Sequence, residues 1–133
     1  MAALTQADYR QLAAFRHALR RFLAFSEQAA EAAGLTPQQH QALLAIKGME
    51  DGPPTIGALA EQLCIRPHSA VGLIDRLAAR DLVTRAEDRA DRRQVHVALT
   101  AAAEAMLEVL SAAHRAELER IAPTLRALLT PFG

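Results

Sequence analysis

The chain has 133 residues, about half of them hydrophobic, and no formal net charge. This length suits one domain, residues 1–133, with a core of its own, and no apolar run is long enough to span a membrane. The lone cysteine, Cys64, excludes an internal disulfide framework. Since the N-terminus also lacks the pattern of an export signal, we expect a cytoplasmic protein.

The first predicted element is a long helix over residues 6–33, which Gly34 ends. Its hydrophobic residues offer more apolar surface than one small core needs. They are Leu12, Phe15, Leu19, Phe22, Leu23 and Phe25. The excess favours packing against a partner helix, and packing onto the helix's own chain is the alternative.

Two shorter helices follow. Thr36 and Pro37 supply the N-cap and the first position of the second helix. After a turn-rich linker, Thr55 caps a third helix over residues 56–63. The turn at residues 64–66 leads into a fourth helix, so the order is that of a helix-turn-helix.

The fourth helix is predicted from Pro67 to about Arg80, with Asp81 in the left-handed conformation after it. Its core-facing residues repeat at helical spacing. They are predicted to be Val71, Ile74, Leu77 and Ala78. Polar and small residues lie largely off that face, and this distribution favours an exposed surface that binds another molecule.

Strand-like runs over residues 82–85 and 94–99 flank a charged loop. From Arg66 to Arg93 the chain has seven arginines against five acidic residues. A helix followed by an arginine-bearing hairpin predicts a winged helix-turn-helix, whose helix enters the major groove and whose hairpin tip reaches the backbone or the minor groove. The alternative is an ordinary solvated loop whose arginines pair with the acidic residues beside them.

Thr100 caps the last long helix, predicted over residues 101–121. Pro123 is expected to break or kink it before a short final helix at residues 125–129. Because apolar helices lie at both ends of the chain with the hairpin region between them, we predict a homodimer. Two copies would match a near-palindromic double-stranded DNA operator with half-sites about one helical turn apart.

The stretch from residue 75 to residue 100 resembles the MarR family of winged helix-turn-helix transcriptional regulators. The matching residues are Asp75-Arg76-Leu77, Leu82-Val83, Arg85, Asp91-Arg92-Arg93, Val95, Val97 and Leu99-Thr100. They reproduce the family's recognition-helix, turn and wing motifs without a gap, and the flanking helices agree in order and length. Asp81 stands where the family usually has glycine. Gly72 stands where many relatives have a longer polar or basic residue, which leaves the operator sequence open.

The residues and the resemblance together predict a mainly α fold with a small β-wing. The DNA-binding lobe would span residues 35–99, and residues 1–34 and 100–133 would form a helical dimerisation lobe. The resemblance implies a repressor rather than an activator, in a bacterial cytoplasm and nucleoid-associated when bound to DNA. It also implies that Arg93 pairs with Asp75 and ties the wing to the recognition helix.

Seven residues are predicted to contact DNA: Arg66, His68, Ser69, Arg76, Arg89, Arg92 and Arg93. Arg89, nearest the wing tip, is expected in the minor groove. Arg66 and Ser69 suit phosphate contacts, and His68 either reaches a base or faces solvent. Arg76 has two interpretations, a phosphate contact or a salt bridge to local acidic residues.

Relatives commonly release DNA when a small anionic or phenolic molecule binds between the dimer helices and the reader, so the resemblance leaves a small-molecule effector open. The candidate ligand residues are Arg16 and Arg20, with Arg21 beside them, and His40. A solvated face for the arginines and a structural, interfacial role for His40 are the preferred interpretations.

Cys64 is expected to be a small buried thiol rather than a redox sensor, which requires exposure and a lowered pKa. The sequence has no metal-binding, phosphate-loop or nucleophile motif, so we predict no cofactor, metal site or catalytic residue, and no enzyme. Two other functions stay open. One is a helical adaptor that has lost specific DNA binding, favoured by Gly72 and the zero net charge, and the other is a thiol- or metal-responsive sensor.

Overall fold

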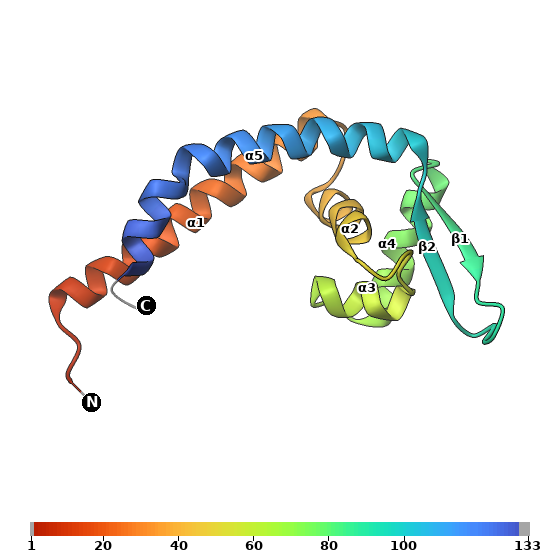
Figure 1. Ribbon diagram of the computed structural model, residues 1–133, viewed down its shortest axis with the longest axis horizontal. Helices are drawn as coiled ribbons and strands as arrows, with labels where there is room; N and C mark the ends of the chain where they lie inside the picture. The colour runs from red at the N-terminus through yellow and green to blue at the C-terminus, as the bar shows by residue number, and fades with distance from the viewer. Residues whose placement is uncertain (1, 131–133) are drawn as a thin grey trace.

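The structure is a computed structural model that describes residues 2–130. Its elements are α1 (Gln6–Ala32), α2 (Pro37–Gly48), α3 (Ile56–Leu63), α4 (Pro67–Ala79), β1 (Val83–Glu87), β2 (Val95–Leu99) and α5 (Ala101–Leu129). Helices α1 and α5 run side by side as a curved arm, and the other elements form a lobe at one end of it (Figure 1). We call residues 35–99 the reader lobe. The predicted fold class, mainly α with a two-stranded antiparallel wing, is confirmed.

The helix boundaries follow the predicted capping residues. The Thr36 and Thr55 hydroxyls accept hydrogen bonds from backbone N–H groups in the first turns of α2 and α3, and Thr100 does the same for α5. Gly34 after α1 has φ +80° and Asp81 after α4 has φ 57°, both in the left-handed region. No helix in the part of the chain that the structure describes is both long and apolar enough to cross a bilayer.

The hydrophobic core lies in the reader lobe and in the adjoining ends of the arm. Among the described residues of α1 only Ala30 is buried, and in α5 the buried residues lie in its first three turns, ending at Leu110. The largest fully buried side chains all come from the reader lobe. They are Leu43, Leu59, Ile74, Leu77 and Val97. The lobe and the adjoining ends of the arm therefore share one core.

The predicted core face of α4 is partly wrong. Ile74 and Leu77 are buried as predicted, but Val71 is 44% exposed, and Ala70 and Leu73 take the remaining buried positions. The buried stripe is shifted round the helix because α3 and β1 pack against α4 and decide which side is covered.

The first strand of the wing reaches further towards the tip than the sequence predicted, whereas both strands begin one residue later. β1 continues to Glu87, which pairs with Val95 across the hairpin, and Ala86 pairs with His96. The loop between the strands is thereby reduced to residues 88–94. Cross-strand pairing extends the ordered part of the wing towards its arginines.

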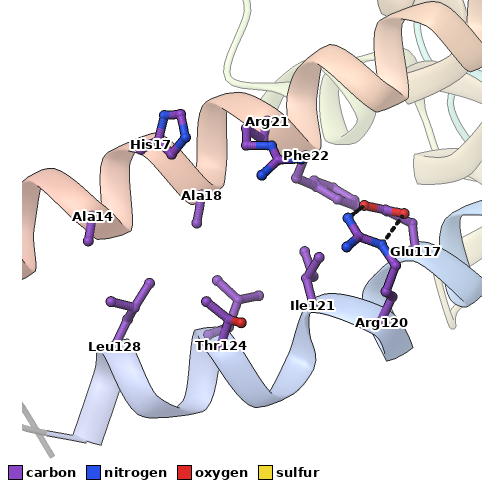
Figure 2. Close-up of a pocket in the computed structure, with 11 residues that line it drawn as sticks. Ala14, His17, Ala18, Arg21, Phe22, Glu117, Arg120, Ile121, Thr124 and Leu128 are labelled. Atoms are coloured by element: carbon purple, nitrogen blue, oxygen red, sulfur yellow. Dashed lines mark hydrogen bonds and ion pairs between the residues drawn. The ribbon is translucent and has the colours of Figure 1, made fainter.

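The predicted break at Pro123 is also wrong, because α5 continues without interruption to Leu129. A proline inside a helix removes one backbone hydrogen bond and costs about 3 kcal/mol. Side chains on both sides of Pro123 face α1 across the arm: Leu128 lies opposite Ala14, and Ile121 lies near Phe22 (Figure 2).

Candidate DNA-binding site

Helix α4 is positioned by a tight turn after α3. Cys64 ends α3 with φ 57°, and the N–H of Ile65 donates to the carbonyl of Ala60 at 3.0 Å. The expectation that Cys64 is buried is wrong: its side chain is exposed. Cys64 is the left-handed C-cap at the end of α3, and burial falls on its two neighbours, Leu63 and Ile65, which are half-buried.

The far end of α4 is held by Arg80. Its Nη1 donates to the carbonyl of Gly34 at 2.8 Å and to Oε1 of Gln39 at 3.2 Å. Gln39 is itself part of the capping box at the start of α2. Arg80 is thus committed to joining the recognition helix to the start of the reader lobe.

The predicted pair of Asp75 with Arg93 is not formed. The carboxylate of Asp75 accepts a hydrogen bond from Arg85 instead, and Arg93 donates Nε to Oδ1 of Asp91 at 3.0 Å. Arg85 can reach Asp75 because β1 begins only a few residues after α4 ends. Arg93 instead binds Asp91, which lies two residues before it in the same loop. A wing-to-helix ion pair therefore exists, but Arg85 makes it.

Acidic side chains shape the wing loop from within. Oδ1 of Asp88 accepts hydrogen bonds from the backbone N–H groups of Ala90, at 2.7 Å, and Asp91, at 3.1 Å. The pKa of Asp88 is lowered from its usual value, first by its hydrogen bond with His96 and then by these two backbone hydrogen bonds. The salt bridge and backbone bond from Arg93 lower the pKa of Asp91 in the same way.

His96 fixes the wing to the loop before α3, a role that its place in the strand pattern did not reveal. Its Nδ1 lies 2.8 Å from the carbonyl oxygen of Pro53, and its Nε2 lies 2.8 Å from Oδ2 of Asp88. Two acceptors are both satisfied only by the protonated ring, so the Pro53 carbonyl first and Asp88 second raise the pKa of His96. The N–H of Val97 adds a 2.9 Å bond to the carbonyl of Pro54.

The remaining predicted DNA contacts face solvent. The side chains concerned are Arg66, His68, Ser69, Arg76, Arg89 and Arg92, and all are exposed. Within residues 2–130 none of these six makes a salt bridge or a side-chain hydrogen bond, in contrast to Arg80, Arg85 and Arg93. The reader lobe therefore separates its arginines into three that hold the lobe together and four that are available to a ligand.

A histidine pair joins the reader lobe to the arm. His40 of α2 is 3% exposed, and its ring centroid lies 4.8 Å from that of His114 on α5. His114 is held by the Leu110 carbonyl at 2.7 Å and the Ser26 hydroxyl at 2.8 Å, whereas the buried Nδ1 of His40 has no partner among the described residues. Burial first, and the neighbouring His114 second, lower the pKa of His40.

The arm contains a pocket of about 290 Å³ between α1 and α5, which we call the arm pocket (Figure 2). It is lined by Ala14, His17, Ala18, Arg21, Phe22, Glu117, Arg120, Ile121, Thr124, Leu125 and Leu128. Arg120 and Glu117 form a salt bridge at its rim (Figure 2).

The three candidate ligand residues are not brought together. Arg16 and Arg20 are exposed and do not line the arm pocket, and His40 is buried at the junction with the reader lobe. His17 and Arg21, one position further along α1, line the pocket instead. Ala14 and Ala18 at helical spacing mark this side of α1, and that pattern of small residues was the available clue. The part of the chain that the structure describes has no group of three or more His, Cys, Asp or Glu side chains placed to hold a metal ion.

A family model described as MarR family matches residues 33–94, which cover α2 to the wing loop. Over these residues, which make up slightly less than half of the chain, the sequence is similar to the MarR family. The resemblance seen in the sequence is thereby confirmed for this MarR segment. The chain has no significant match among curated protein sequences.

Solved structures share the fold over most of the chain. AbsC, a MarR family transcriptional regulator from Streptomyces coelicolor, has a TM-score of 0.78 at 19% identity, with 99% of this chain and 95% of that chain covered. The MepR–DNA complex of S. aureus has a TM-score of 0.73 at 18% identity, covering 92% and 86%. CouR from Rhodococcus jostii RHA1, bound to p-coumaroyl-CoA, has a TM-score of 0.68 at 24% identity, covering 79% and 73%. At these identities the likeness concerns the fold.

Proposed function

We propose that the protein is a sequence-specific DNA-binding transcriptional regulator that acts in the bacterial cytoplasm as a homodimeric repressor. The observation that carries the proposal is the set of four exposed, unengaged arginines on the outer side of α4 and on the wing. They are Arg66, Arg76, Arg89 and Arg92. Such arginines supply forked donors for phosphates and guanine edges.

In this proposal α4 enters the major groove and the wing tip follows the adjacent minor groove. His68 and Ser69, in the first turn of α4, are placed to meet base edges or phosphates. Arg89 is proposed for the minor groove and Arg92 for the backbone beside it. Arg93 supports the loop through Asp91 and is proposed as a secondary contact. The MepR–DNA complex, with the same fold, supports this mode of binding.

The arm supports the homodimer. Leu12, Leu19 and Leu23 of α1 are 44%, 37% and 53% exposed and follow one another at helical spacing, and Leu118 of α5 is 44% exposed. Exposed apolar stripes of this kind mark surfaces that pair with another molecule. A second copy of the arm would cover them and set two copies of α4 at a fixed separation.

Release of DNA by a small molecule is the least constrained part of the proposal. CouR, bound to p-coumaroyl-CoA, shares the fold and supports an effector of this general kind. In this chain the arm pocket combines an apolar floor with the positive charge of Arg21 and with His17, which suits an anionic molecule.

The alternative function is a helical adaptor that keeps the fold without specific DNA binding. Gly72 favours it, because a recognition helix usually presents a longer polar residue to bases, and the zero net charge favours it as well. The two functions differ in whether DNA binding survives competition by unrelated DNA.

The test is binding of the full chain to the promoter region next to its own gene, over a series of salt concentrations and with unrelated DNA as competitor. We expect binding that resists the competitor and a footprint of two half-sites about one helical turn apart. Arg89→Ala is expected to lower the slope of log affinity against log salt by about one unit. Arg115→Ala, at an exposed arginine of α5, is the control and should leave the slope unchanged. Weak binding that the competitor abolishes, at this promoter and among genome-wide fragments, would favour the adaptor.

A further inference from the structure

Val71 lies on the outer side of α4, away from the core. Its side chain is 44% exposed, and within residues 2–130 it is the only large hydrophobic residue of α4 that is exposed. The buried stripe of the helix is complete without it, since it consists of Ala70, Leu73, Ile74 and Leu77. Valine also has a lower helix propensity than alanine. The fold therefore gives no reason for valine at this position.

The surroundings of Val71 are polar. Helical spacing places it in one stripe with His68 and Asp75, which are both exposed. The carboxylate of Asp75 forms an ion pair with Arg85 of the wing. Arg66 and Arg76, both exposed, lie before and after the stripe. Val71 is thus a single apolar spot in a basic, polar surface.

Gly72 leaves the helix surface beside Val71 open. A Cβ at this position would meet only the far end of Arg76, whose Nη1 would lie 3.4 Å away. The fold therefore does not require glycine here. Without a side chain at position 72, the backbone of α4 can approach another surface closely, with the valine methyl groups as the leading atoms.

The major groove of DNA offers one apolar group to such a surface, the C5-methyl group of thymine. We propose that Val71 contacts a thymine methyl group in each operator half-site and is a specificity-determining residue of the recognition helix. This inference rests on the proposed DNA-binding function. In this inference the contact between the methyl groups of valine and thymine discriminates between bases, whereas Arg66 and Arg76 bind the phosphate backbone of the DNA.

The test begins with DNA fragments that the full chain selects from a random pool. We expect the selected sequences to share a thymine at one position of each half-site. Replacing that thymine by deoxyuridine removes only the methyl group, and it is expected to weaken binding of the original chain about fourfold per half-site. The Val71→Ala variant is expected to bind both DNAs equally and to select sequences without a preference at that position.

Val109→Ala is the matched control, because it makes the same change at a valine of α5 that is 73% exposed. It should keep the preference for thymine over deoxyuridine. Suppose that the original chain selects a specific sequence, but that replacing any of its thymines by deoxyuridine changes DNA binding by the original chain and by Val71→Ala equally. The inference about Val71 is then overturned, and the DNA-binding function stands. If the original chain enriches no sequence, the proposed function fails and the inference fails with it.

Discussion

The reader lobe and the outer part of the arm differ in what they bury. The outer arm comprises residues 6–29 of α1 and residues 111–129 of α5, and none of these described residues is fully buried. The reader lobe, by contrast, encloses large side chains such as Leu59, Ile74 and Val97 almost completely. One region completes its core within a single chain, and the other leaves a stripe of leucines exposed.

This difference separates two sources of stability. Apolar burial within the chain contributes most to the free energy of unfolding of the reader lobe, at about 25 cal/mol per Å² of apolar area removed from water. Long helices gain most of their stability from packing rather than from propensity. In the proposed homodimer a second copy would cover the outer arm, so the stability of the arm should depend on protein concentration.

The largest expected effect comes from emptying the core of the reader lobe. Ile74→Ala removes a fully buried side chain and should lower the free energy of unfolding by about 2–5 kcal/mol. Chemical denaturation followed by circular dichroism measures this loss, which should not vary with protein concentration.

Leu118→Ala provides the contrast, since this leucine of the outer arm is 44% exposed. Its cost should be smaller and should grow with protein concentration as dimers form. A cost for Leu118→Ala that stays the same at every concentration would show that no second copy covers this leucine.

A charge in the exposed stripe should break the pairing of the arms. Leu19→Asp is expected to raise the dimer dissociation constant about a hundredfold, because each dimer loses two buried leucines at about 1.5 kcal/mol or more each. Sedimentation equilibrium measures the constant directly. Leu44→Asp makes the same change on α2, at a leucine that is 49% exposed, and should leave the dimer intact. A dimer unchanged by Leu19→Asp would exclude this stripe from the interface.

Local rules explain which features the sequence predicts well. Each cap depends on one residue and its nearest neighbours, so Thr36, Thr55, Thr100 and the left-handed Asp81 were identified correctly. The winged fold was predictable for the same reason, because its helices and strands are short segments with clear punctuation.

Features that depend on packing were harder to predict. Periodicity identifies apolar residues on a helix but does not choose between adjacent stripes, so Val71 was assigned to the core although α3 and β1 cover the neighbouring side. The pairing of Asp75 with Arg93 was taken from the family resemblance, and the residues of this chain pair differently: Arg85 binds Asp75, and Arg93 binds Asp91. The predicted contacts of Arg89, Arg92 and His68 with DNA stay predictions.

The junction between the two regions should respond to pH. The pKa of His40 is lowered by burial and by His114, so the unfolded chain binds a proton at a higher pH than the folded chain. Stability at this site should therefore be complete above the ordinary histidine pKa of about 6.5 and should decrease as the pH falls from there towards the lowered pKa. Denaturation at several pH values measures this effect.

The variant His40→Phe should remove part of this pH dependence, because the ring is retained without a titrating group. His68→Phe, at an exposed histidine of the reader lobe, should leave the pH dependence intact. His96 acts in the opposite direction: its pKa is raised by the Pro53 carbonyl and Asp88, so its contribution is present in acid and is lost as the pH rises through the raised value. If His40→Phe and His68→Phe had the same pH profile as the original chain, His40 would not carry the response.

The smallest expected effect concerns the ion pair between α4 and the wing. Asp75 and Arg85 are 52% and 45% exposed, so their interaction should contribute about 0.2–1 kcal/mol. A double-mutant cycle of Asp75→Asn with Arg85→Gln should show coupling of that size in the free energy of unfolding. The parallel cycle with Arg93→Gln should show none, because Arg93 is bound to Asp91 within the loop. Coupling to Arg93 instead of Arg85 would mean that the wing adopts the pairing first expected from the family resemblance, and that its tie to the recognition helix lies nearer the tip.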